Sequence, residues 1–239
     1  MSLPQIIVVT GTDTDVGKTV VTAAVAALLV GAGRTVAAYK PTQTGVAPGD
    51  PADMAEVTRL SGVAGHDGVR LGDPMAPRPA AAREDAVLPG LAHHLTAVAA
   101  LAATHDHVLV EGAGGLLVEL TEDADTIADL ALALGVHGLE TGVLTVARSG
   151  LGTLNHTMLT REALRRRGIR EIGIVIGSWP DEPDMIEESN WAYFSELDDG
   201  LLGAVPSGAP ARDASSFAAL APGWLPGLAA MLGQRRGTP

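Results

Sequence analysis

The sequence contains no cysteine and few aromatic residues, and both absences restrict what the protein can be. Without cysteine there can be no disulfide bond, thiolate metal site, iron–sulfur cluster or cysteine nucleophile. Only 3% of the residues are aromatic, although 46% are hydrophobic. The core must therefore consist mainly of Ala, Val, Leu and Ile, a composition typical of parallel sheets covered by helices.

Basic residues and long hydrophobic runs are also scarce. The chain has 16 Lys and Arg residues against 28 Asp and Glu residues, a formal net charge of -12 at pH 7. Because phosphate backbones are bound by an excess of Lys and Arg, we expect no nucleic-acid partner. The charge-free apolar run Thr19–Gly33 is shorter than the roughly 18–20 residues that span a bilayer, and Met1–Gln5 lacks the basic segment of a signal peptide. We expect a cytoplasmic protein without a membrane partner.

Short apolar runs alternate with longer helical stretches, the pattern of βαβ units in a parallel sheet. The predicted strands are Ile6–Val9, Thr35–Tyr39, Val108–Glu111, Gly142–Val146, Ile172–Ile176 and Leu202–Val205. The predicted helices are Lys18–Ala32, Pro51–Leu60, Leu91–Thr104, Thr126–Leu134, Thr153–Arg167, Asp184–Leu197 and Ser215–Ala221. Proline and glycine predict loops at Asp73–Pro79 and Pro206–Pro210. The chain is predicted to form one α/β domain over residues 1–239, with a disordered tail at 234–239.

The stretch Gly11–Thr19, which reads Gly-Thr-Asp-Thr-Asp-Val-Gly-Lys-Thr, lies between an apolar strand and an apolar helix. This is the context of a phosphate-binding P-loop, in which backbone N–H groups cradle the phosphates. Lys18 would neutralise the terminal phosphates, and the Thr19 hydroxyl would bind Mg²⁺. Five residues, not the usual four, separate Gly11 from Gly17. The alternative, a glycine-rich turn with an incidental Gly-Lys-Thr, is disfavoured by the flanking strand and helix.

Three more residues are candidates for the same chemistry. The carboxyl ends of parallel strands face the ligand crevice, so Lys40 could join Lys18 in stabilising a transferring phosphoryl group. Glu111 ends a buried strand before the glycine-rich Gly112–Gly115, where P-loop proteins place a second acid directed at Mg²⁺. Asp53 lies in the first turn of a predicted helix. Alternatively, Lys40 only ends its strand, Glu111 turns to solvent, and Asp53 complements a helix dipole.

The segment Gly152–Asn155 opens another predicted helix directly after a strand and a loop. Its free N–H groups could hold an anion such as a substrate carboxylate, or Thr153 could serve only as an N-cap. Five histidines show no metal-ligand spacing beside acidic residues, and we interpret them as surface or packing residues. They are His93, His94, His105, His107 and His137.

Together, four stretches resemble the dethiobiotin synthetase family in order and approximate spacing: Gly11–Thr19, Lys40-Pro41, Val110–Gly115 and Leu151–His156. The resemblance implies a P-loop NTPase-like α/β fold with a mostly parallel sheet flanked by helices on both faces. It implies a homodimer with the substrate near the subunit interface. The implied reaction joins 7,8-diaminopelargonic acid to CO₂ (or bicarbonate) as a carbamate. ATP phosphorylates the carbamate, and the second amine closes the ring of dethiobiotin, releasing ADP and phosphate in a step of biotin biosynthesis.

The resemblance also implies roles for individual residues. Lys18, Lys40 and Asp15 would be catalytic, and Mg²⁺ would be bound by Thr19, Asp53 and Glu111. The implied nucleotide-binding residues are Thr14, Asp15, Val16, Gly17, Lys18, Thr19, Val20, Gly177, Ser178, Pro206, Ser207, Gly208 and Ala209. The implied substrate-binding residues are Thr44, Met75, Ala76, Gly114, Gly152, Thr153, Leu154 and Asn155, the last four from the other subunit.

One departure from the family pattern concerns the nucleotide base. Many members carry an Asn-Asp pair where this chain has Gly177-Ser178, and the Asn reads the adenine edge. Without a bidentate amide the main base discriminator is lost, so we expect other nucleoside triphosphates to be accepted beside ATP. Backbone groups of Pro206–Ala209 would still contact the base.

Two other classes of P-loop protein compete with this interpretation. Partition ATPases usually carry an extra lysine early in the phosphate loop, and Thr12-Asp13 supplies none. They also need a basic patch or an amphipathic anchor, which the composition does not offer. Amidotransferase synthetases of the cobyrinic-acid type depend on a cysteine nucleophile in a glutaminase domain, and this chain has neither.

Overall fold

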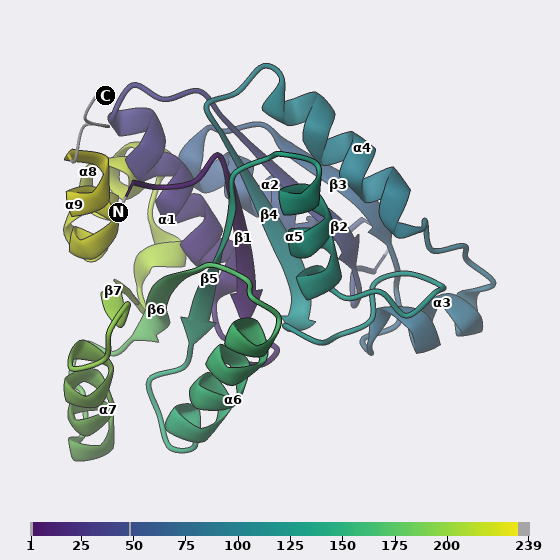
Figure 1. The fold of residues 1–239 in the computed structure, drawn as a ribbon. Helices are drawn as coiled ribbons and strands as arrows, with labels where there is room; N and C mark the ends of the chain where they lie inside the picture. The colour runs from purple at the N-terminus through teal and green to yellow at the C-terminus, as the bar shows by residue number, and fades with distance from the viewer. Residues whose placement is uncertain (1, 48, 234–239) are drawn as a thin grey trace.

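A computed structural model describes residues 2–47 and 49–233, and the tail predicted at 234–239 lies outside them. The strands are β1 Ile6–Gly11, β2 Val36–Gln43, β3 Gly65–Arg70, β4 His107–Gly115, β5 Thr141–Ala147, β6 Glu171–Trp179 and β7 Leu201–Pro206. Over these residues they form one sheet in the order β3-β2-β4-β1-β5-β6-β7 (Figure 1). Every neighbouring pair is parallel, as predicted.

Helices cover both faces of this sheet (Figure 1). On one face lie α1 Lys18–Gly31, α2 Asp53–Ser61, α8 Ala214–Trp224 and α9 Pro226–Gly233. On the other lie α4 Leu91–Ala102, α5 Ile127–Val136, α6 Thr153–Arg166 and α7 Met185–Ser195. Because both faces are covered, the central strands are apolar throughout: all of Ile6–Val9 is fully buried. Small and branched side chains, mainly Ala, Val, Leu and Ile, fill the space between the sheet and the two helical layers.

The fold prediction is confirmed in its strands and long helices, and sequence capping signals explain several boundaries. Thr126 caps α5 in a reciprocal capping box with Asp129, so the helix starts one residue later than predicted. Asp184 caps α7 in the same way with Glu187. Side-chain caps satisfy N–H groups that have no partner within the helix, which is why these residues mark helix starts.

Four features differ from the prediction. The loop predicted at Asp73–Pro79 is wrong in its last part, because helix α3 runs over Pro77–Glu84. The loop predicted at Pro206–Pro210 is confirmed at Ser207-Gly208 and wrong at its ends, because β7 includes Pro206 and a 3-10 turn occupies Ala209–Ala211. Proline lacks only an N–H group that a first helical turn leaves unpaired, so it does not exclude a helix start.

Strand β3 and helix α9 were not predicted at all. The β3 sequence Gly-His-Asp-Gly-Val-Arg offers no apolar run, because at the sheet edge its residues alternate between half-buried and exposed.

Among the described residues, no single helix is long and apolar enough to cross a membrane. Only α8 and α9 taken together, bent by 80° at the break between them, meet the length and composition criteria.

Candidate active site

The phosphate loop connects the end of β1 to the start of α1 and packs backbone to backbone on β6. Gly17, the N-cap of α1, has φ 91°, a left-handed conformation that favours glycine. A Cβ atom at Gly17 would lie 2.6 Å from the Gly177 carbonyl oxygen, and one at Gly177 would lie 1.9 Å from the Val16 carbonyl oxygen. No side chain caps α1. The first N–H groups of α1 are therefore left for an anion.

A buried charged cluster lies beside this loop. Lys40 ends up between two carboxylates: its Nζ donates to Oδ2 of Asp53 and, at 2.6 Å, to Oε1 of Glu111. The Thr19 hydroxyl also donates to Glu111 Oε1, at 2.9 Å. Lys40 is 4% exposed and Glu111 0%. The cluster forms because β2 and β4 are neighbours whose carboxyl ends meet next to β1.

The two lysines of the site have opposite pKa shifts. Burial lowers the pKa of Lys18, although the attraction of Glu111 opposes this effect. Burial would also lower the pKa of Lys40, but the attraction of Glu111 and Asp53 outweighs it, so the pKa of Lys40 is raised. Lys18 Nζ donates to the backbone carbonyl of Asp13 at 3.1 Å. Lys18 thus has a carbonyl partner, and its charge can be neutralised by an anionic ligand.

The oxygen atoms of this cluster fit Mg²⁺. Glu111 Oε2 is buried and has no hydrogen-bond partner among the described residues, and a carboxylate of Asp53 and the Thr19 hydroxyl lie in the same cluster. No group of three or more His, Cys, Asp or Glu residues that could hold a metal occurs in the described part of the chain. Mg²⁺ commonly takes one or two carboxylates together with substrate phosphates, so the set fits a nucleotide-associated ion.

One polar residue at this site escaped the sequence analysis. Gln43, at the end of β2, is buried, and its Oε1 accepts a hydrogen bond from the Asp53 backbone N–H at 2.9 Å. This bond holds the start of α2 and thereby the Asp53 carboxylate beside Lys40. Its position three residues after Lys40, on the same strand end, was the available signal.

A cavity of about 770 Å³ joins the phosphate loop to the charged cluster and to the segment before α3. It is lined by twelve of the predicted site residues: Thr14, Asp15, Gly17, Lys18, Thr19, Lys40, Thr44, Asp53, Met75, Ala76, Glu111 and Gly114. It is also lined by six residues that were not predicted: Gln43, Gly45, Pro74, Pro77, Ala113 and Val118. All six are close neighbours in the chain of predicted residues. The cavity therefore has a phosphate end and a less polar end formed around Pro74–Pro77.

The remaining predicted residues lie outside this cavity. Val16 is buried in the core beneath the phosphate loop. Gly177 packs on that loop, and Ser207 N donates to the Trp179 carbonyl at 2.8 Å, which places the Pro206–Ala209 turn next to the end of β6. Val20 and Ser178 are likewise not in the cavity lining, and neither is Gly152–Asn155. One chain alone does not bring Gly152–Asn155 to the cavity wall.

Comparisons with known proteins agree with this geometry. A family described as "AAA domain" matches residues 5–213. The chain is 51% identical over 225 residues to the ATP-dependent dethiobiotin synthetase BioD of Streptomyces avermitilis, with 92% of each chain covered. It is 47% identical to the protein of that name from Saccharopolyspora erythraea, covering 97% of this chain and 98% of the other.

Solved structures show the same fold at low sequence identity. The septum site-determining protein MinD complexed with Mg-ADP, from Pyrococcus horikoshii, matches with a TM-score of 0.57 and 16% identity over 96% of this chain and 93% of that one. An apo-form GTPase from Pyrococcus abyssi matches with a TM-score of 0.54 and 15% identity, covering 92% and 97%. These likenesses establish a P-loop NTPase fold. The phosphate loop, the charged cluster and the full-length similarity lead to one conclusion: the chain belongs to the ATP-dependent dethiobiotin synthetase family.

Proposed function

We propose that the protein is an ATP-dependent dethiobiotin synthetase, which converts 7,8-diaminopelargonic acid, CO₂ and ATP into dethiobiotin, ADP and phosphate for biotin biosynthesis. The observation that carries the proposal is the cavity that joins the phosphate loop to Lys40 and Glu111 and continues to Thr44 and Met75. Such a cavity can hold a triphosphate at one end and a long diamine at the other. The similarity to synthetases of that name over more than nine-tenths of the chain supports it.

In this reaction one amine nitrogen bonds to the carbon of CO₂ and loses a proton, giving a carbamate. A carbamate oxygen then attacks the γ-phosphorus of ATP and ADP leaves, so that a carbamic-phosphoric anhydride forms. The second amine attacks the carbonyl carbon, phosphate is expelled, and the ring closes. Since the substrates supply all the reacting atoms, the protein has to position them, neutralise charge and exclude water.

The residues at the phosphate end suit this task. Lys18 and the α1 N–H groups would hold the phosphates, and Asp15 lies beside them on the cavity wall. Lys40, held by Asp53 and Glu111, lines the same cavity as Lys18, and its charge would stabilise the transferring γ-phosphoryl group. Charge that develops on phosphoryl oxygens is stabilised best by cations already in place. Thr19, Asp53 and Glu111 would hold Mg²⁺, which neutralises phosphate charge when bound.

The substrate end is proposed to need a second copy of the chain. Thr44, Met75, Ala76 and Gly114 line the cavity where the carbon chain would lie. The segment Gly152–Asn155 would bind the far carboxylate but does not line the cavity of its own chain. A homodimer in which each subunit completes the other's site would resolve this. Exposed leucines around the start of α6 offer apolar surface for such contact: Leu117, Leu151 and Leu159.

The nucleotide base is proposed to meet mainly backbone. Gly177 has no room for a side chain, because a Cβ atom there would clash with the Val16 carbonyl. Discrimination must therefore come from Ser178 or from the Pro206–Ala209 turn. A base read mostly by backbone groups leaves ATP and other nucleoside triphosphates closer in affinity.

The first test measures phosphate release from Mg-ATP with and without diaminopelargonic acid and bicarbonate, with dethiobiotin followed by mass spectrometry. We expect release only when both co-substrates are present, together with dethiobiotin. A Lys18→Ala variant serves as the control for contaminating ATPases. Release that needs neither co-substrate would instead identify a P-loop ATPase with another partner.

A further inference from the structure

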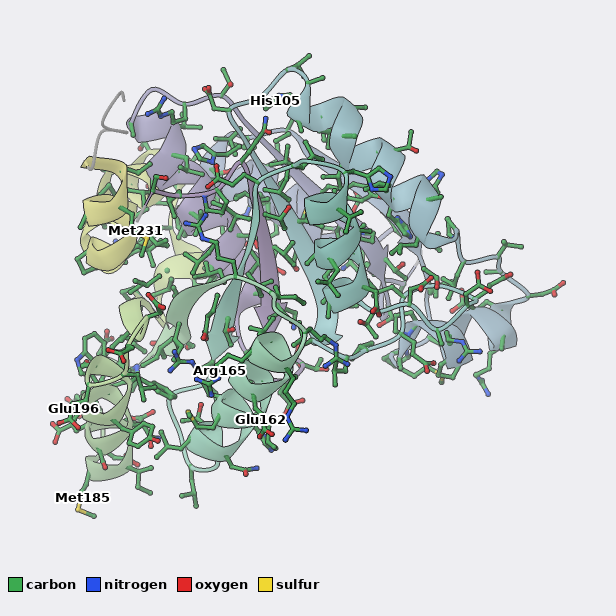
Figure 2. All side chains as sticks on the ribbon, in the orientation of Figure 1. His105, Glu162, Arg165, Met185, Glu196 and Met231 are labelled. Carbon is green, nitrogen blue, oxygen red and sulfur yellow. The ribbon has the colours of Figure 1, made fainter. Side chains whose placement is uncertain are left out.

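A buried side chain of α7 donates two hydrogen bonds to the loop 148–152, which connects β5 to α6. Asn190 Nδ2 donates to the backbone carbonyl of Ser149 at 2.7 Å and to that of Gly150 at 3.2 Å. Asn190 is only 5% exposed. A buried amide that donates to two carbonyls fixes a loop more strongly than packing alone, because losing the donor costs the Gly150 carbonyl one of its two partners and leaves the Ser149 carbonyl without this bond. Met185 and Glu196 mark the two ends of α7 in Figure 2.

Glu187 ties the same loop to the rigid start of α7. Its Oε1 accepts a hydrogen bond from the Ser149 hydroxyl at 2.7 Å, and its Oε2 accepts one from the Asp184 backbone N–H at 3.0 Å. The Asp184 carboxylate in turn caps α7. One carboxylate therefore joins the loop to a helix start that is already fixed by a capping box.

A third bond closes the network from inside α6. The buried Thr153 hydroxyl donates to the Arg148 carbonyl at 2.7 Å. The carbonyls of Arg148, Ser149 and Gly150 are thus all bound by side chains. The chain then turns at Gly152, with φ 89°, and no side chain caps α6. The Thr153 N–H donates to the Gly150 carbonyl at 3.3 Å, so within the described residues the N–H groups of Leu154 and Asn155, in the first turn of α6, remain for an outside anion.

We propose that Asn190, with Glu187, is a positioning residue for the far carboxylate of the substrate. The inference rests on the proposed function, under which the N–H groups of Gly152–Asn155 bind that carboxylate. Asn190 touches no substrate, and it acts by holding the loop that carries those N–H groups. Displacing a binding group by about 1 Å can cost up to a hundredfold in rate, so a change at this remote site is expected to be measurable.

The sharpest variant is Asn190→Asp, which keeps the shape of the side chain but replaces the donor by a carboxylate that faces two carbonyls. We expect the KM for diaminopelargonic acid to rise at least tenfold with kcat changed less than about threefold, the pattern of lost uniform binding. The dissociation constant of Mg-ADP should stay within about threefold, because the ion pair that links loop 148–152 to the phosphate loop, Arg148 with Asp13, is exposed.

The matched control is Phe194→Leu, on the same helix. Phe194 is fully buried against Ile174 and Ile176, and its side chain cannot hydrogen-bond to the loop. This variant therefore weakens the packing of α7 and keeps the hydrogen bonds from Asn190 to the loop. It should lower thermal stability and leave the KM for the diamine near that of the wild type. Equal rises in KM for the two variants would show that Asn190 only packs α7, which overturns the proposal.

A second probe isolates the carboxylate. The compound 2,3-diaminononane has the carbon chain of the substrate with a methyl group in place of the carboxylate. Wild type and Asn190→Asp should turn it over with the same kcat/KM, because it has no carboxylate to hold. A tenfold loss on this diamine as well, or an unchanged KM on the natural one, overturns the positioning role while the proposed function stands. A wild type that forms no dethiobiotin overturns both.

Discussion

Two different kinds of charge pair lie at the two ends of the cavity, one in its lining and one just outside it. At the phosphate end, Lys40 and Glu111 are at most 4% exposed and lie on neighbouring central strands. At the substrate end, the ion pairs around α3 are exposed: Arg78 with Glu119, at 43% and 45%, and Arg83 with Asp73. A protein loses much of its folding stability when one partner of a buried ion pair is removed, whereas an exposed ion pair contributes only about 0–1 kcal/mol to that stability. Stability should therefore depend on the Lys40–Glu111 pair far more than on the exposed pairs around α3.

The largest expected effect is that of Lys40→Met, which leaves Glu111 buried without its counter-charge. We expect the free energy of unfolding in EDTA to fall by about 3–5 kcal/mol. We also expect kcat to fall by roughly 10²–10³-fold, as when one stabilising group of a transition state is lost. Urea unfolding and steady-state kinetics measure the two effects. A variant as stable as the wild type would show that buried Glu111 does not need the charge of Lys40.

Next in size is Gly177→Ala, which tests the backbone packing of the phosphate loop. The new Cβ atom would lie 1.9 Å from the Val16 carbonyl oxygen and 2.7 Å from Val146 Cγ1, and the first clash is with backbone, which no side-chain rotation can relieve. We expect a loss of about 1–3 kcal/mol in unfolding free energy, with weaker Mg-ADP binding in calorimetry. Gly135→Ala, at a helical position with nothing within 4 Å, is the control and should be nearly neutral.

The buried hydrogen bond between Tyr39 and His94 contains no ion pair, so it shows the effect of burial without that of a counter-charge. Tyr39, next to Lys40 on β2, bonds through its hydroxyl to His94 Nδ1 at 2.7 Å, and burial lowers the pKa of His94 to about 4. Since that pKa lies below its unfolded value of 6.5, His94 contributes stability at neutral pH that is lost as the pH falls from 6.5 toward 4. In His94→Leu this part of the pH dependence should disappear. The melting temperatures of wild type and His94→Leu are measured at pH 7 and pH 4.5. Equal drops in melting temperature for the two proteins would contradict a role of His94 in the pH dependence.

The proposed base site lies where Gly177 packs on the phosphate loop and the Pro206–Ala209 turn meets the end of β6. Because Gly177 leaves no amide to read the base, we expect kcat/KM for ATP to exceed that for CTP or GTP by less than about tenfold, or 1.4 kcal/mol. Competition assays with the three triphosphates under saturating diamine give the ratio. A preference for ATP above tenfold would place strong discrimination in Ser178 or the Pro206–Ala209 turn.

The smallest expected effect is that of Arg78→Ala, the exposed counterpart of Lys40→Met. Its ion pair with Glu119 is open to solvent, so we expect no measurable change in the unfolding free energy. The KM for the diamine should move less than threefold, because the pair lies outside the cavity lining. A loss of unfolding free energy as large as that of Lys40→Met would contradict the view that the buried pair matters more for stability than the exposed pair.

Local sequence was sufficient wherever local physics decides the structure. The apolar runs on both faces of β1 and β4 predict buried parallel strands, and Gly-Lys-Thr between a strand and a helix predicts a phosphate loop. Thr126 and Asp184 carry their helix starts in their own capping signals. The strand β3 could not be predicted in this way, because an edge strand beside β2 needs no apolar run.

The sequence by itself determined the fold class and the phosphate loop, because these follow from hydrophobic period and short motifs, and its resemblance to a family indicated most of the cavity lining. Only the tertiary structure decided which partners each polar group finds. That Lys40 lies between Asp53 and Glu111, that Gln43 holds Asp53, and that Asn190 holds the loop before α6 all depend on strand order and helix packing. These partners are far apart in the chain, and no local pattern encodes a contact that exists only after the sheet has assembled.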